Sequence, residues 1–123
     1  MPNVLSSTPG AGHYIVSEAD GYRSRDQVVI ASTSGVLLPG AVLGKVTASG
    51  KYMPLAPAAA DGTQTAAAVL FEGCDATAAD VRRTATTRDS EVSAAALVWP
   101  AGTTDPQKTA ALAALAAVGI IAR

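Results

Sequence analysis

One stretch of the sequence, residues 36–71, places the strongest limits on how the chain can fold. Its short apolar runs are separated by residue pairs that bend the backbone, namely Pro39-Gly40, Ser49-Gly50 and Asp61-Gly62. Each run is too short for a helix and stops at a turn signal. The stretch therefore predicts a tightly folded meander of short β-strands.

Two residues refine this prediction. Gly44 interrupts the apolar run 41–46, and a glycine inside a strand indicates a bulge or a close approach of another backbone. Pro54 lies in the run 52–55 and has no N–H to donate to a ladder, so that run is predicted to be an edge strand.

The rest of the chain supplies further strands and one helix. Residues 27–31, 66–72 and 82–88 have strand character, residues 75–80 are a small-residue connection with room for one helical turn, and residues 91–99 return toward the core. We expect Leu97, Val98 and Trp99 to be buried, because the only tryptophan usually anchors a small core.

The C-terminal segment begins with helix signals. Asp105 can cap a helix and Pro106 suits the first turn, which predicts a helix over residues 106–117. No charged residue follows Lys108 within it. A helix that is apolar on every side is normally buried on more than one side. We therefore expect another subunit to cover it, although a monomer that tolerates exposed alanines is the alternative.

Composition agrees with self-association. The 123 residues are 49% hydrophobic but only 4% aromatic, and alanine buries little area at about 25 cal/mol per Å². A core that buries so little apolar area suggests that the subunit gains stability by burying surface against its own copies. The residues predicted to pack the core or the interface are Trp99, Leu112, Leu115 and Val118.

The N-terminal region differs from the rest of the chain in composition and in hydrophobic periodicity. Residues 1–12 contain prolines, glycines and small hydroxyl residues without periodicity, which predicts a flexible arm. Residues 13–17 have β propensity and suit an added strand. Arg23 and Arg25 either meet carboxylates on a partner or belong to a solvated link. The predicted division is an arm over 1–25 and a single domain over 26–123.

Several kinds of chemistry are not supported. The net charge is −1 with no basic run, which argues against direct nucleic-acid binding. His13 and Cys74 are the only residues of their types, so neither a catalytic triad nor a metal cluster is expected. Cys74 is predicted to be a small buried hydrophobe. We expect no enzyme activity and no cofactor.

No membrane association is expected either. The longest apolar run, residues 110–122, is too short to cross a bilayer, and no signal peptide is visible. One alternative function stays open. Lys51 follows Gly50 at a predicted hairpin, as in a lipoyl-type carrier, although the usual acidic neighbour is missing. A small carrier or ligand-binding β-barrel is therefore the second hypothesis.

The order of several short motifs resembles the head decoration protein family of tailed bacteriophages. The motifs are Asp61-Gly62-Thr63, Ala67-Ala68-Val69, Leu97-Val98-Trp99-Pro100 and a C-terminal segment that ends in Ile120-Ile121. The resemblance covers residues 36–123 and implies a mostly β, β-clip-like fold with one Ala-rich helix. It also implies a structural protein of the virion, made late in the host cytoplasm and placed on the outer surface of the capsid head.

In that family a homotrimer occupies local threefold positions of the expanded shell and stabilises it against the pressure of packaged DNA. The resemblance implies that the N-terminal arm pairs with strands of the major capsid protein. The expected capsid-binding residues in the arm are His13, Tyr14, Ile15, Val16, Tyr22, Arg23 and Arg25.

Overall fold

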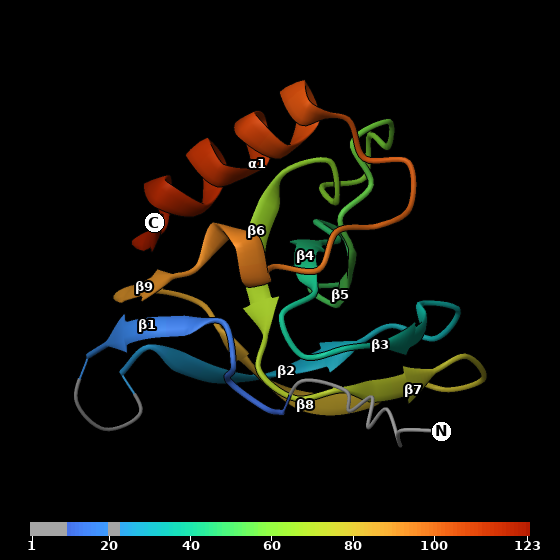
Figure 1. Ribbon diagram of the computed structural model, residues 1–123. Helices are drawn as coiled ribbons and strands as arrows, with labels where there is room; N and C mark the ends of the chain where they lie inside the picture. The colour runs from blue at the N-terminus through green and yellow to red at the C-terminus, as the bar shows by residue number, and fades with distance from the viewer. Residues whose placement is uncertain (1–9, 20–22) are drawn as a thin grey trace, which may run out of the picture.

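The computed structural model describes residues 10–19 and 23–123. It shows a mostly β protein with one α-helix near the C-terminus (Figure 1), which confirms the predicted fold class. The elements are, in chain order, β1 (Ile15–Glu18), β2 (Arg25–Ile30), β3 (Gly35–Leu37), β4 (Val42–Lys45), β5 (Tyr52–Pro54), β6 (Ala66–Leu70), β7 (Cys74–Ala76), β8 (Val81–Thr86), β9 (Ser90–Val92), a 3-10 helix η1 (Ala94–Ala96), α1 (Asp105–Ala117) and β10 (Ile120–Ala122).

The strands form three groups. A closed barrel has the order β2-β5-β4-β6-β8, a second sheet has the order β1-β9-β10, and β3 pairs with β7. Within residues 36–71 the β4–β5 hairpin forms as expected, whereas β6 returns along the other side of β4. The strands of this stretch therefore do not pair in simple succession.

Strands β4 and β6 form a wall that separates two hydrophobic cores. Leu43, Ala68 and Leu70 belong to the core inside the barrel, while Val42 and Val69 belong to the core on the other side. Adjacent strand residues point to opposite faces, so this wall is buried on both sides. Its apolar run has no polar alternation for that reason.

The second core lies between the wall, the β1-β9-β10 sheet and α1. Leu115 and Ala111 enter it from the helix, and Ile120 and Val92 enter it from the sheet. Figure 1 shows α1 at the top of the view across the end of β6. The expected extended piece at Ile120-Ile121 is β10, which runs parallel to β9.

Gly44 is a point of close approach, as the sequence predicts. A Cβ atom at this position would lie 2.5 Å from the Cα and carbonyl oxygen of Thr63. The β4–β6 register also shifts between Leu43 and Gly44. Only glycine lets the loop that carries Thr63 pack against β4 without displacing backbone.

Three local predictions differ from the structure. Pro54 does not lie on an open edge, because β5 closes the barrel through the single pair Ile30–Tyr52 and pairs Pro54 with Leu43 on β4. The connection predicted over residues 75–80 begins instead with strand β7, which pairs with β3. The return segment forms only the short strand β9 and then η1.

Burial after η1 also differs from the prediction. Leu97 is buried, but Val98 and Trp99 are only partly buried. The Trp99 ring packs against the second core from its rim, and the Lys108 Nζ atom lies 6.0 Å from the ring centroid. The barrel interior is already filled by aliphatic side chains and alanine, so the tryptophan has no site there.

Helix α1 begins with a capping box. Thr104 is the N-cap, and its hydroxyl accepts a hydrogen bond from the Gln107 backbone N–H while the Gln107 side chain accepts one from the Thr104 N–H. Asp105, the predicted cap, is the first helical residue. Among the described residues, the chain forms no helix with the length and hydropathy needed to cross a bilayer.

The close approach at Gly44 yields a prediction. Gly44→Ala should lower the free energy of unfolding by about 1–3 kcal/mol, because the new methyl group overpacks against the Thr63 backbone. Urea denaturation followed by circular dichroism measures this change. The matched control is Gly10→Ala, since a Cβ there has nothing within 4 Å. Equal stability of the two variants would show that β4 does not need glycine.

Candidate functional site

Tyr14 fixes the N-terminal segment to the body of the protein. Its side chain is fully buried, and its hydroxyl lies 2.7 Å from the Thr86 hydroxyl and 3.4 Å from the Val69 carbonyl oxygen. Its own carbonyl accepts a 2.7 Å hydrogen bond from the Ser93 N–H. Burial raises the pKa of Tyr14 to about 12, with the Thr86 hydrogen bond opposing the shift. Tyr14 therefore acts as an anchor and does not offer its ring to a partner.

A tight turn precedes this anchor. The Gly12 N–H donates a 2.9 Å hydrogen bond to the Phe71 carbonyl. Gly12 has φ +69°, and a Cβ there would lie 2.7 Å from the Phe71 ring, so both conformation and space favour glycine. The His13 ring nitrogens lie 3.1 Å from the carbonyl oxygens of Gly10 and Ala96. The turn thus holds residues 10–13 against Phe71 and Ala96.

Strand β1 presents an open edge. In the described part of the chain it pairs with β9 alone, and it stands first in the sheet order β1-β9-β10. Ile15 packs against the second core, whereas the Val16 side chain is 56% exposed. An exposed strand edge with an apolar side chain is a template for another strand.

The basic residues near this edge already have partners within the chain. Arg25 forms an ion pair with Glu18 and lies over the Phe71 ring at 4.1 Å from its centroid. Burial raises the pKa of Glu18, but hydrogen bonds from Arg25 and Ser24 outweigh that effect, so its net pKa is lowered. Arg23 lies 3.5 Å from Asp89 and is well exposed.

Tyr22, the remaining residue of the expected binding set, lies outside the described residues. Of that set, the structure brings His13, Tyr14 and Ile15 against the body of the protein and leaves Val16 and Arg23 on the surface.

Helix α1 has a second face that the described residues do not cover. Leu115 is buried and Leu112 is partly buried against the second core, while Val118 is 41% exposed. The outward positions are almost all alanine: Ala110, Ala113, Ala116 and Ala117 are exposed. This face has no charged side chain after Lys108.

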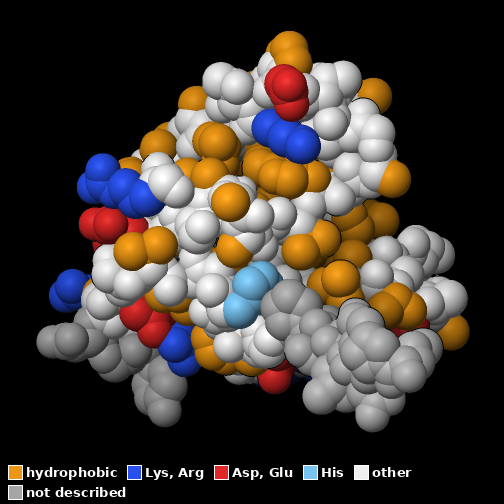
Figure 2. All heavy atoms as spheres, viewed as in Figure 1, with side chains coloured by type: hydrophobic (Ala, Val, Ile, Leu, Met, Phe, Trp, Pro, Cys, Tyr) orange, Lys and Arg blue, Asp and Glu red, His pale blue; other side chains and the backbone are white. Residues whose placement is uncertain are grey.

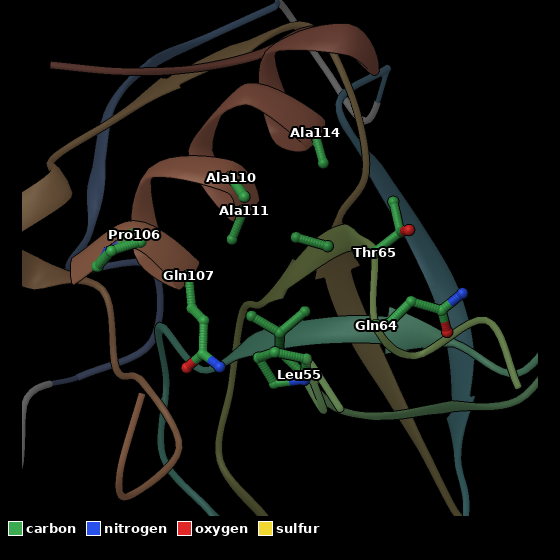
Figure 3. Close-up of a pocket in the computed structure, with 10 residues that line it drawn as sticks. Leu55, Gln64, Thr65, Pro106, Gln107, Ala110, Ala111 and Ala114 are labelled. Atoms are coloured by element: carbon green, nitrogen blue, oxygen red, sulfur yellow. The ribbon is translucent and has the colours of Figure 1, made fainter. Parts of the chain in front are cut away.

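A cavity of about 380 Å³ lies beside the helix (Figure 3). Figure 3 shows Ala111 and Ala114 of α1 facing Leu55 and the segment that carries Gln64 and Thr65. Its lining is mostly apolar with a few amide and hydroxyl groups. Such a lining can hold neutral groups, and none of its side chains is charged.

A second hollow was not predicted from the sequence. It has a volume of about 290 Å³, and its walls are the segment from Val36 to Val42 and the segment from Val98 to Pro100, with Pro54 between them. Val36 is 70% exposed and Leu38 is 42% exposed. The sequence signal for this hollow is the apolar run before Pro39-Gly40. A strand with one face in water would alternate apolar with polar residues, whereas this run has branched apolar side chains at successive positions.

Figure 2 shows how charge is distributed on one face of the molecule. Hydrophobic side chains occupy much of its centre and right side, and the charged side chains lie mostly along the left side and at the top. The face is therefore suited to contact with a protein surface more than with a polyanion.

Lys51 does not match the geometry of a carrier lysine. Its Nζ atom lies 2.6 Å from an Asp80 carboxylate oxygen, and the other Asp80 oxygen accepts a 2.7 Å hydrogen bond from the Ser32 N–H. The hydrogen bonds from Lys51 and from the Ser32 backbone lower the pKa of Asp80. The lysine is thus held against the barrel by an ion pair.

The potentially reactive groups are structural. Cys74 is buried in the barrel core, and burial raises the pKa of its thiol, which disfavours the nucleophilic thiolate. Among residues 10–19 and 23–123, no three His, Cys, Asp or Glu side chains gather in a way that could hold a metal ion.

Comparison with known proteins adds one finding. The family described as bacteriophage lambda head decoration protein D matches residues 4–120 of the chain. No individual curated protein sequence matches it. The match includes β1, the barrel and the whole of α1.

The Tyr14 anchor yields a prediction. Tyr14→Phe removes the hydroxyl and leaves the buried Thr86 hydroxyl without its partner, so the free energy of unfolding at pH 7 should fall by about 1–2 kcal/mol. Between pH 10 and about 12 the folded wild type keeps the phenol proton that the unfolded chain loses. Its stability should therefore fall in this window by up to about 1.4 kcal/mol per pH unit from this residue, and the variant should lack that contribution.

Denaturant titrations at several pH values measure both effects. The control is Tyr52→Phe, because the Tyr52 ring is only partly buried, and it should retain most of the alkaline slope. An unchanged slope in Tyr14→Phe would contradict the assignment of Tyr14 as the buried anchor.

Proposed function

The chain belongs to the bacteriophage lambda head decoration protein D family, and from this premise we propose that it binds the expanded phage head as a homotrimer. The trimer sits at local threefold positions on the outer surface of the shell. There it clamps neighbouring capsomers against the pressure of packaged DNA. The protein is made in the host cytoplasm and works in the virion as a structural component, without catalysis or a cofactor.

The observation that carries this proposal is the open edge of β1. A strand of the major capsid protein can add to that edge through main-chain hydrogen bonds, which give affinity, while an exposed side chain gives selectivity. Val16 is the side chain placed to do this, since it is the most exposed large apolar residue of β1.

Residues 1–25 act together as the capsid-binding arm in this proposal. Tyr14 is the internal anchor, and Ile15 packs beneath the strand. His13 holds the preceding turn against Ala96. Arg23 is the basic side chain with the greatest freedom to meet a carboxylate on the shell, because its ion pair with Asp89 is long and exposed. Arg25 forms an ion pair with Glu18, the last residue of β1, and so helps to hold the end of that strand in place.

The trimer interface is proposed to include the outer face of α1. Alanine allows close approach of a neighbouring subunit, and Val118 adds a larger apolar contact at the end of the helix. In a closed threefold assembly, each of the three subunits buries this face against a neighbour. It also presents three β1 edges to the shell, so each can bind weakly while the trimer holds firmly.

The β1 edge can be tested by one substitution. Val16→Lys places a charge on the edge and opposes strand addition, so affinity for expanded capsids should fall by about tenfold or more, which corresponds to about 1.4 kcal/mol. Co-sedimentation of the variant with expanded shells measures the affinity. Because Val16 is exposed, thermal stability should stay near that of the wild type.

The matched control is Val29→Lys, which places the same charge on an exposed valine of barrel strand β2. It should decorate shells normally. Wild-type affinity of Val16→Lys, or an equal loss in the control, would exclude the β1 edge as the contact.

The helix face is tested by solution mass. The wild type should sediment at about three times the 12.2 kDa of one chain. Ala113→Glu with Ala117→Glu introduces charge into the proposed interface and should yield monomers. Ala101→Glu, at an exposed loop position, should leave the trimer intact. A monomeric wild type, or a trimeric double variant, would remove α1 from the interface.

A further inference from the structure

The Asp61-Gly62 pair, in the loop between β5 and β6, has a chemistry that the proposed function does not use. The chain contains two Asp-Gly pairs, and the other, Asp20-Gly21, lies outside the described residues. Glycine lacks the Cβ atom that shields the backbone nitrogen of other residues, so an aspartate before a glycine is prone to rearrange to isoaspartate. Asp61 is exposed. The loop therefore carries a candidate site for a spontaneous covalent change.

The rearrangement joins two neighbouring residues and consumes no reagent except water. The Gly62 backbone nitrogen bonds to Cγ of the protonated Asp61 carboxyl group, and the carboxyl hydroxyl leaves with the amide proton as water. The product is a succinimide ring. Water then adds to one of its two carbonyls. Opening at Cγ restores aspartate, whereas opening at the main-chain carbonyl leaves the backbone running through Cβ and Cγ, which is isoaspartate.

Hydrogen bonds hold both reacting groups in the folded loop. The Gly62 N–H donates a 2.8 Å hydrogen bond to Gln64 Oε1. Asp61 Oδ1 accepts hydrogen bonds from the Thr63 hydroxyl at 2.5 Å and from the Thr63 N–H at 3.1 Å. These two bonds lower the pKa of Asp61, which reduces the protonated form that reacts. The nitrogen and the carboxyl group are therefore both restrained from reacting.

The loop cannot avoid this chemistry by replacing its glycine. Gly62 has φ +109°, and a Cβ there would lie 2.4 Å from both the Lys45 carbonyl oxygen and the Thr47 hydroxyl oxygen. The Asp61 carbonyl also accepts a 2.9 Å hydrogen bond from the Thr47 N–H. An extra backbone atom at Asp61 would displace the loop from the end of β4. Protection of the pair therefore has to come from its hydrogen bonds.

We propose that Asp61 is the isoaspartate-forming site of the described chain, and that Gln64 protects it by holding the Gly62 nitrogen. Asp75 provides a comparison within the same protein. Its Oδ1 atom accepts the same two hydrogen bonds, from the Thr77 N–H and hydroxyl, but alanine follows it and the methyl group hinders attack. The proposal concerns the chemistry of one loop and is independent of the capsid contact and of the trimer.

Isotope labelling measures the reaction at Asp61. Each succinimide that opens in water enriched in the heavy oxygen isotope takes up one heavy atom, which mass spectrometry of the digested chain locates. The folded full-length chain at neutral pH should label Asp61 more slowly than the same chain in urea. Gln64→Ala should speed labelling of the folded chain about fivefold, the factor that corresponds to the loss of a hydrogen bond worth about 1 kcal/mol.

Two further variants separate this hydrogen bond from a general loosening of the fold. Gln64→Glu keeps an acceptor oxygen at the same position and should retain the wild-type rate. Gln27→Ala removes another exposed glutamine, whose side chain donates a hydrogen bond to the Thr84 hydroxyl, and should also leave the rate unchanged. Circular dichroism confirms that each variant is folded.

Three results would overturn the proposal. The first is equal labelling of Asp61 in the wild type and in Gln64→Ala. The second is an equal rise in Gln27→Ala, which would make the effect unspecific. The third is equal labelling of the wild type in the folded state and in urea, which would show that the loop does not protect the pair.

Discussion

The wall formed by β4 and β6 is the constraint on which the rest of the fold depends. One face of this wall fills the barrel and the other supports α1 and the β1-β9-β10 sheet. A wall that is buried on both faces leaves no position for a polar side chain. It also needs a small residue wherever another segment of backbone packs against it. Gly44 meets that requirement against Thr63. Ala66 of β6 meets it beneath the helix.

The functional surfaces follow from this arrangement. Because α1 uses Ala111 and Leu115 to pack on the wall, the described residues leave its alanine-rich outer face exposed. Because Tyr14 reaches through the second core to Thr86, β1 is held at the margin of its sheet with one edge open. The same subunit therefore carries both surfaces on which the proposed function rests, the outer face of α1 and the edge of β1.

Local sequence signals predicted much of the fold. Turn pairs located most of the barrel strands, Asp105 and Pro106 located the start of α1, and Gly44 was correctly expected to mark a close approach. Strand order was not predictable, because pairing between β4 and β6 or between β3 and β7 depends on contacts distant in sequence. The burial of Tyr14 was missed for the same reason, since its partner Thr86 lies in β8. The hollow beside Trp99 arises from segments that meet only in the folded chain.

The proposed mode of decoration is tested by a density map of expanded heads, from the phage that encodes this protein, after incubation with the purified full-length chain. We expect three-lobed density at local threefold positions on the outer surface, with a capsid strand alongside β1 of each lobe. Bare threefold positions at saturating protein would contradict it. So would a lobe that contacts the shell through the barrel with its β1 edge facing solvent.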